Sequence, residues 1–466
     1  MAGIGFRLQL LLNEETTGSQ LKALFYSAII ATGPWLISVT CIALIGLLTP
    51  AGLGQQAVEA FRVTVTYAYA CSIITVGMGY MVVTRHIADR LFAGDEGALA
   101  PAFFTSALMV VGVQAVLGGV AAFFLEGPFA YRVTTVALYI IISLIWHAMI
   151  FLSAARDYDA IVRAFFVGSA VCVGASWALG SLTGWVGYLV GFTLGQGVIW
   201  ALLCCRVLIE FDAAHVWDGS VPTAFRSYRE LFWIGLFYNL GIWIDKFVFW
   251  FGPEGRPVMF PLWTYSPYDS ALFLAYLTVV PASTLFLIKV ETGFYDAYRD
   301  FYGAIERRAS LPQIRARQEE LGATLTGGLG AVIKIQGAIS ATCLLFSDVI
   351  IDVVGLAPSA TGMFRVGILG AFLHSLFLIA LVMIMYFDLR RLALRLSLMF
   401  CLLNFGLTLA TQSLGHAWYG YGYAVAALIS FGLAYLFLAQ QVNRLIYLTF
   451  AGQPVVVPAV EVEEGA

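Results

Sequence analysis

The chain has 466 residues, of which 61% are hydrophobic and only 11% are charged. Soluble proteins carry about a quarter charged residues, so this chain has too little polar surface to cover soluble domains. The composition excludes a soluble class and indicates a polytopic membrane protein, and the net charge of −3 argues against nucleic acid as a partner.

Twelve apolar segments of about 20 residues, the length that crosses a bilayer, follow one another along the chain. The first is too long for a signal-peptide core and no small-residue cleavage site precedes it, so we expect it to remain as a transmembrane helix. Only Gly184 and its neighbours separate the fifth segment from the sixth. We expect an all-α integral membrane protein with spans near 22–48, 61–84, 102–125, 133–153, 162–182, 185–206, 230–251, 270–289, 328–351, 363–387, 396–413 and 420–440.

Lysine and arginine are unevenly distributed between the connections. If the N-terminus lies inside, most of the 25 fall on the cytoplasmic side, and the outer side holds only Arg62, Arg132, Arg256 and Arg365. This asymmetry follows the positive-inside rule and predicts that both termini are cytoplasmic.

The long connection at 207–229 divides the spans into two groups of six. We therefore expect an N-terminal lobe over 1–206, a cytoplasmic linker at 207–229, a C-terminal lobe over 230–440 and a cytoplasmic tail over 441–466. Because six is even, the two lobes run in the same direction, as parallel repeats do. The proline-rich outer connection at 252–269 is expected to cap the outer opening.

The cytoplasmic insert at 290–327 has an amphipathic pattern. Its aromatic side chains follow helical spacing on one face, while Asp and Arg occupy the other positions. Ser310 and Gln313 then form a capping box that opens a polar helix through Glu320. One interpretation is a helix at the membrane surface. Another, compatible with it, is a docking surface for a cytoplasmic partner, formed by Tyr295, Tyr298, Phe301 and Tyr302.

Asp245 and Lys246 are adjacent charges inside the seventh span. A charge near the bilayer centre costs about 2.5–3.5 kcal/mol on insertion scales, so such residues need partners, water or a function. Adjacent helical residues point about 100° apart, so we expect the two not to face one partner, with Lys334 in the ninth span a candidate partner for Asp245. Asn239, about two turns earlier, extends the polar stripe. The sequence leaves open a structural ion pair or a cavity-facing role.

The first span contains Gly33 and Pro34. A proline inside a helix removes a hydrogen bond and kinks the helix. This pair is a hinge candidate, although the same bend also suits packing alone.

No catalytic or metal-binding pattern stands out. The five histidines are scattered, the seven cysteines have no CxxC spacing, and no Walker A loop is present. His147 and His374 lie in spans, where isolated histidines are usually packed and hydrogen-bonded. We expect no enzymatic activity, no cofactor and no metal.

Several motifs spread over almost the whole chain resemble the PelG-like exopolysaccharide transporters, the inner-membrane exporters of the Pel system. They are MAGIGF at 1–6, TGPW at 32–35, TRHIADRLF at 84–92, YNLGIWIDKFVFWF at 238–251, SPYD at 266–269, IKVET at 288–292 and WYGYG at 418–422. One departure is the polar stretch at 13–20, where a more basic segment is expected.

The resemblance implies a member of the multidrug/oligosaccharidyl-lipid/polysaccharide exporter superfamily, with two six-helix lobes around a central cavity. It implies export of a galactosamine-rich polymer across the bacterial inner membrane. It also implies two partners, a cytoplasmic glycosyltransferase and a membrane-anchored cyclic-di-GMP receptor. On this reading the first and seventh spans line the cavity, and Trp35, Trp243 and Tyr238 are candidates to stack on sugar rings.

Other functions remain open at this point. They are a flippase for lipid-linked oligosaccharide, a cation-coupled drug antiporter, and a non-transporting assembly subunit of a polysaccharide synthase complex.

Overall fold

The computed structural model describes residues 37–47, 55–155, 157–211, 215–286, 290 and 292–451. The hinge candidates Gly33 and Pro34, and the aromatic candidate Trp35, lie outside this range.

Ten helices of the described chain are long and apolar enough to cross a membrane. They are α3 (Gln55–Phe92), α4 (Leu99–Phe124), α5 (Phe129–Ala154), α6 (Tyr158–Thr183), α7 (Trp185–Glu210), α9 (Arg229–Trp250), α13 (Leu311–Leu345), α15 (Ala360–Tyr386), α16 (Arg390–Ser413) and α17 (Tyr421–Asn443). A shorter apolar helix at Ile37–Leu47 falls within the first predicted span.

The predicted span at 270–289 is interrupted. It contains α10 (Ser266–Leu277) and α11 (Val280–Leu285). Pro281 lies in the first turn of α11, where its missing N–H group is tolerated, but it cannot continue the hydrogen bonding of α10. Each of the twelve predicted spans therefore contains helix in the described structure.

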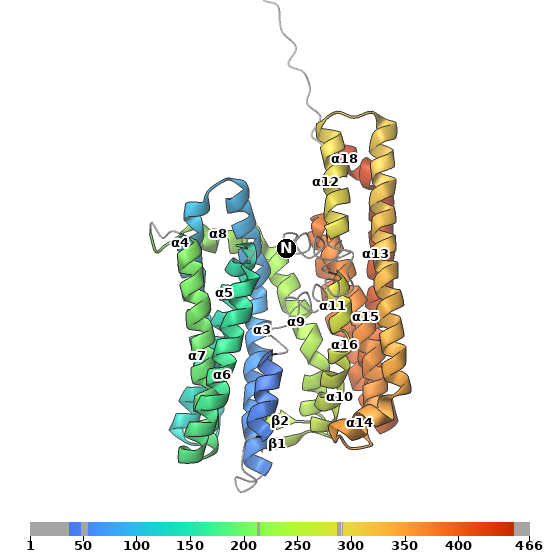
Figure 1. The fold of residues 1–466 in the computed structure, drawn as a ribbon. Helices are drawn as coiled ribbons and strands as arrows, with labels where there is room; N and C mark the ends of the chain where they lie inside the picture. Colours follow the sequence, from blue (N-terminus) through green and yellow to red (C-terminus); the bar gives the residue numbers. More distant parts are fainter. Residues whose placement is uncertain are drawn as a thin grey trace, which may run out of the picture.

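The helices form two groups that lie side by side, with α3 to α7 in one and α9 to α17 in the other (Figure 1). The groups meet along α3 and α9. Gly77 and Gly235 allow this contact, because a Cβ atom on Gly235 would lie 2.0 Å from the carbonyl oxygen of Gly77. Helix α9, which carries the charged pair, is thus the C-terminal group's contact with the N-terminal group.

The connections separate to the two ends of the molecule (Figure 1). At one end lie α8 (Ser220–Ser227), α12 (Thr292–Glu306), α18 (Leu445–Ala451) and the turn between α3 and α4, which includes the short helix η2 (Glu96–Ala98). At the other end lie the strands β1 (Arg256–Met259) and β2 (Leu262–Thr264) and the helix α14 (Ser347–Val354). A further short helix, η4 (His416–Trp418), precedes α17. This arrangement follows the alternation expected from the lysine and arginine distribution.

Gly184 separates α6 from α7, as the sequence predicts. Its φ of 75° lies in the region that favours glycine, so the chain reverses there without strain. The two helices then pack closely, because added Cβ atoms on Gly191 and Gly195 would lie 2.3 Å from Ser176 N and Cys172 Sγ, respectively.

The linker between the two groups is fixed to α3. Asp218 lies 3.2 Å from His86 Nε2, and Arg90 Nη2 donates to Ser220 Oγ at 2.7 Å. Burial alone would raise the pKa of Asp218, but hydrogen bonds from Ser220 and His86 outweigh it and hold that pKa below its ordinary value. The carboxylate therefore stays charged at neutral pH, and the anchor persists.

The insert differs from the prediction in one respect. The capping box at Ser310 and Gln313 is present. However, the polar helix does not end near Glu320, because it continues into the ninth span as the single helix α13. Its 35 residues span about 50 Å against about 30 Å of hydrocarbon, so α13 extends well beyond the membrane. No proline interrupts it after the first turn, and Gly327 and Gly328 alone do not end a helix.

Candidate functional site

The charged pair of α9 is buried inside the C-terminal group. Asp245 is 0% exposed and Lys246 is 7% exposed. Lys246 Nζ lies 3.0 Å from both carboxylate oxygens of Asp245 and also donates to the carbonyl of Ile242 at 3.1 Å. The two side chains thus bond directly to each other, which the sequence did not predict, because the flexible lysine stem folds back along the helix.

Lys334 is not the partner of Asp245. It is exposed on α13. The second partner of Asp245 is Tyr268 of α10, whose hydroxyl donates to Oδ2 at 2.8 Å. The carboxylate thus receives hydrogen bonds from its own helix and from a neighbouring one.

The Lys246 ammonium also faces two aromatic rings. It lies 5.5 Å from the ring centre of Tyr276 on α10 and 5.6 Å from that of Tyr423 on α17. Such cation–π contacts are worth about 0.5–2 kcal/mol each. They compensate part of the desolvation of the ammonium group.

A hydrogen-bonded chain continues from these rings. The Tyr276 hydroxyl donates to Tyr423 at 2.8 Å, and the Tyr423 hydroxyl lies 3.1 Å from His374 Nδ1. His374 Nε2 lies 3.3 Å from the Tyr238 hydroxyl, so both ring nitrogens have partners. The predicted role of His374 as a packed, hydrogen-bonded residue is confirmed.

These seven residues form one polar cluster, which we call the α9 cluster: Tyr238, Asp245, Lys246, Tyr268, Tyr276, His374 and Tyr423. It joins α9, α10, α15 and α17. A buried ion pair is tolerated only when its remaining hydrogen-bonding groups are satisfied. None of the side-chain atoms of this cluster is among the buried unpaired polar atoms of the described chain. Asp245, Lys246, Tyr268, His374 and Tyr423 are buried, whereas Tyr238 and Tyr276 are half-buried.

Two further candidates of the seventh span, Asn239 and Trp243, lie outside the α9 cluster. Asn239 donates to the Gly235 carbonyl at 2.7 Å and lies against Gly77 of α3, so it does not extend the stripe of Asp245. Trp243 is half-buried, and its ring lies 6.3 Å from that of Trp250. Whether these side chains contact a substrate stays a prediction.

Direct contacts join the two groups at the end that carries β1 and β2, which the lysine and arginine distribution predicts to be the outer end. Tyr67 of α3 stacks on Trp250 of α9 with 4.5 Å between ring centres. Arg256 of the hairpin lies 2.7 Å from Glu59, and Arg62 donates to Ser266 at 2.9 Å. We call these contacts the outer clamp. The hairpin thus joins the two groups at this end (Figure 1).

The predicted docking face on α12 is largely occupied by the chain itself. Phe301 is fully buried, and Phe294 packs edge-on against Tyr386 and Phe387. Tyr295, Tyr298 and Tyr302 are half-buried. The apolar face of α12 therefore packs on its own lobe, and Phe301 is not accessible to a partner in this conformation.

The sequence singled out Tyr238 but not the other three tyrosines of the cluster. Tyr268, Tyr276 and Tyr423 carry no charge, and aromatic residues are common in spans and at membrane interfaces. Their importance follows only from the packing of α10 and α17 around Lys246.

Comparison with known proteins identifies the family. A sequence model described as "PelG: Putative exopolysaccharide Exporter (EPS-E)" matches residues 1–450. A comparison with curated proteins finds no match.

Solved structures of similar fold are transporters. An outward-facing multidrug resistance MATE family transporter of the MOP superfamily has a TM-score of 0.66 at 14% identity, with 96% of this chain and 100% of that chain covered. A MATE structure in the bent conformation has a TM-score of 0.65 at 14% identity, covering 97% and 100%. A MOP superfamily transporter from Pyrococcus furiosus has a TM-score of 0.63 at 14% identity, covering 94% and 98%.

This similarity confirms the predicted fold, in which twelve helices form two six-helix lobes. The two groups of helices described above are these lobes. The similarity at this identity concerns the fold alone. The family match covers nearly the whole chain, and the protein is a multi-pass integral membrane protein of the PelG exopolysaccharide exporter family.

Proposed function

We propose that this protein exports a galactosamine-rich exopolysaccharide of the Pel type across the bacterial inner membrane, from a cytoplasmic synthase to the periplasm. The observation that carries the proposal is the family match over residues 1–450. The two-lobe transporter fold supports it, because such a fold provides an interface between lobes through which a substrate can pass.

The polymer would pass between the lobes, along α3 and α9. In the present conformation the outer clamp closes this route, since Tyr67, Trp250, Glu59 and Arg256 join the lobes there. Passage therefore requires these contacts to separate. The stacked rings, the ion pair and the hydrogen bond from Arg62 to Ser266 are weak enough to break and reform, at about 1 kcal/mol each.

The aromatic side chains near the clamp suit a sugar chain. Trp243, Trp250 and Tyr67 lie close together at the meeting of the lobes. Flat aromatic rings present apolar faces of the kind that pack on sugar rings, while the Trp250 N–H is already bonded to Asp269 at 2.9 Å. We expect Trp243 to contact the polymer once the clamp opens.

The α9 cluster would act by holding the C-terminal lobe rigid while the lobes move. Its hydrogen bonds join α9 to α10 and α15, and both of these helices to α17. A satisfied buried polar network specifies one packing arrangement. Contact of Asp245 or Lys246 with the polymer would require the cluster to open.

The partners in this proposal are a cytoplasmic glycosyltransferase and a membrane-anchored cyclic-di-GMP receptor, and both termini lie in the cytoplasm. The hairpin of α12 and α13 would contact them. Because Phe301 is buried, the contact would use the exposed polar side chains, such as Arg299, Arg315 and Glu319.

The test is genetic complementation. A strain lacking the corresponding gene is complemented with the wild-type protein or with Trp243→Ala, and secreted hexosamine polymer is quantified alongside membrane levels of the protein. We expect polymer secretion to depend on the protein and to fall several-fold with Trp243→Ala. The matched control is Trp217→Ala, an exposed tryptophan in the linker, which should secrete normally. Unchanged polymer secretion without the protein would refute the proposal, and drug sensitivity in its place would indicate an antiporter.

A further inference from the structure

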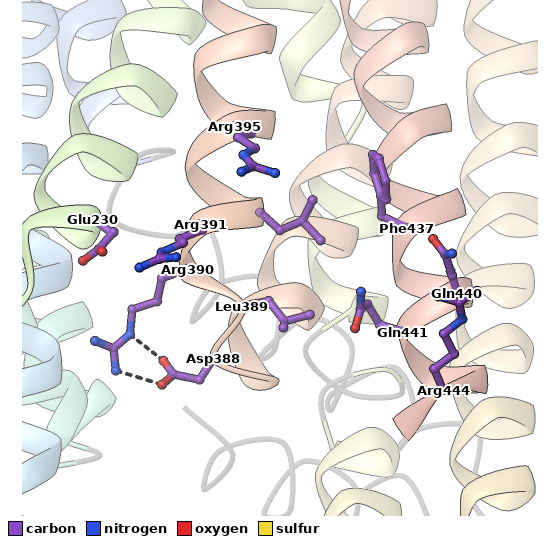
Figure 2. Close-up of a pocket in the computed structure, with 11 residues that line it drawn as sticks. Glu230, Asp388, Leu389, Arg390, Arg391, Arg395, Phe437, Gln440, Gln441 and Arg444 are labelled. Atoms are coloured by element: carbon purple, nitrogen blue, oxygen red, sulfur yellow. Dashed lines mark hydrogen bonds and ion pairs between the residues drawn. The ribbon is translucent and has the colours of Figure 1, made fainter. Parts of the chain in front are cut away.

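A cavity of about 720 Å³ lies at the ends of α9, α16 and α17 on the side of the α12–α13 hairpin. Ligand sites commonly have volumes of about 300–1,000 Å³. Figure 2 shows the side chains that line it. The cavity is separate from the α9 cluster and from the outer clamp, neither of which contributes a residue to it.

The cavity is rich in arginine. Arg390, Arg391 and Arg395 come from α16 and Arg444 follows α17, while the acidic side chains are Glu230 and Asp388. Four arginines against two carboxylates leave an excess of two positive charges.

Half of this positive charge is not balanced by the carboxylates of the cavity. Arg390 forms two hydrogen bonds with Asp388, at 2.7 and 2.8 Å (Figure 2). The side chains of Arg391, Arg395 and Arg444 make no hydrogen bond or ion pair with residues that the structure describes. Guanidinium groups that outnumber the carboxylates of a cavity favour an anionic ligand, and the guanidinium group binds phosphate oxygens in a bidentate manner.

The position of the cavity bears on which kind of anion it binds. The cavity lies at the ends of three helices that are long and apolar enough to cross a membrane, and helix ends of this kind are where we expect lipid headgroups. Phe437, which is 38% exposed, lies on α17 two turns before Arg444, about 10 Å closer to the membrane centre. An apolar side chain among cationic ones fits an amphipathic anion, and basic pockets between spanning helices bind anionic headgroups.

We propose that this cavity is a binding site for a phosphate group, with the headgroup of an anionic phospholipid as its natural source. Arg391, Arg395 and Arg444 bind the phosphate oxygens. The amide groups of Gln440 and Gln441, which also line the cavity, donate to neighbouring hydroxyl groups of the headgroup. Phe437 contacts the upper part of an acyl chain.

The site adjoins the junction of the lobes. Arg390 lies over the ring of Tyr228 at 5.0 Å, and the Tyr228 hydroxyl is hydrogen-bonded to Asp89 at the end of α3. A phosphate in the cavity would compete with Asp388 for Arg390.

The experiment compares lipid binding by charge-matched variants of the purified full-length protein. The pocket variant carries Arg391→Gln, Arg395→Gln and Arg444→Gln. The control carries Arg307→Gln, Arg308→Gln and Arg315→Gln, which removes the same charge from the same end of the molecule outside the cavity. Each variant is delipidated and then titrated with phosphatidylglycerol or phosphatidylcholine, with and without pyrophosphate. Native mass spectrometry measures how much of each lipid the protein retains. Circular dichroism and gel filtration establish folding.

We expect the wild type and the control to retain phosphatidylglycerol in preference to phosphatidylcholine, and the pocket variant to bind it at least tenfold more weakly. If pyrophosphate displaces the lipid at micromolar concentration, the phosphate site stands and its natural ligand is soluble. Equal binding by pocket variant and control overturns the proposal, because the arginines would then serve only membrane orientation. If the triple variant does not fold, Arg395→Gln and Arg444→Gln are titrated singly and judged by the same comparison.

Discussion

The ion pair of α9 gives a quantitative prediction, because each charge is the main partner of the other. Asp245 accepts hydrogen bonds from Lys246 and Tyr268, and no other described donor contacts it. Removing one member of a buried pair costs about 3–5 kcal/mol, whereas replacing both with groups of similar volume is often close to neutral. We therefore compare Asp245→Asn, Lys246→Met and the double variant.

The two single substitutions should reduce the free energy of unfolding by different amounts. Asp245→Asn leaves the Lys246 ammonium with its contacts to the Ile242 carbonyl and two aromatic rings. We therefore expect a loss of stability at the lower end of this range, about 3 kcal/mol. Lys246→Met leaves a fully buried carboxylate with only the Tyr268 hydroxyl, so we expect about 5 kcal/mol. The double variant should be at least about 2 kcal/mol more stable than either single one.

The assay is unfolding of each purified variant in mixed micelles, paired with polymer secretion at matched membrane levels. The double variant should recover both stability and most of the secretion. The reasoning is refuted if the single variants are as stable as the wild type, or if the double variant is folded and stable but does not secrete. In the second case the charges act on the polymer or on a coupling ion, and are more than a structural pair.

Three further predictions follow from the packing. Gly235→Ala should destabilise the protein by about 1–3 kcal/mol, because the added methyl group overlaps α3. The control Gly330→Ala places its methyl group in open space and should be neutral or stabilising by up to about 1 kcal/mol. Thermal unfolding compares the two variants, and equal effects on stability would contradict the close contact of α9 with α3. In a variant without the seven native cysteines, cysteines are placed at Glu59 and Arg256 and joined by a short bismaleimide. This cross-link should stop polymer secretion. Secretion at the normal level after complete cross-linking would show that the outer clamp need not open. Phe301→Ala should cost about 3–5 kcal/mol and raise proteolysis of the α12–α13 hairpin, and unaltered proteolysis would argue against the observed packing of α12.

The membrane spans could be predicted because the bilayer imposes a simple rule. Every span needs about 20 apolar residues with internal hydrogen bonding, and this is visible in the hydropathy of the chain. The break between α6 and α7 at Gly184 and the capping box at Ser310 could also be predicted, since each depends on residues close in sequence.

The site could be predicted only in part. The sequence singled out Asp245 and Lys246, but their partners Tyr268 and Tyr423 lie 23 and 177 residues away and meet them only after α10 and α17 pack beside α9. The pairing with Lys334 failed for the same reason, because depth in the membrane does not specify which face of α13 turns inward. The sequence analysis did not predict the single long helix α13. Polar residues mark where a membrane span ends, but the helix itself continues through them.

The central claim is that the protein moves a polysaccharide between its lobes. The most direct measurement reconstitutes the protein, with its glycosyltransferase and receptor partners, into vesicles supplied with radiolabelled nucleotide sugar on the synthase side. The account predicts labelled hexosamine polymer inside protease-resistant, sealed vesicles, and its absence when Glu59 and Arg256 are replaced by cysteines and cross-linked. Polymer that accumulates equally in vesicles lacking the protein, or despite the cross-link, would contradict it.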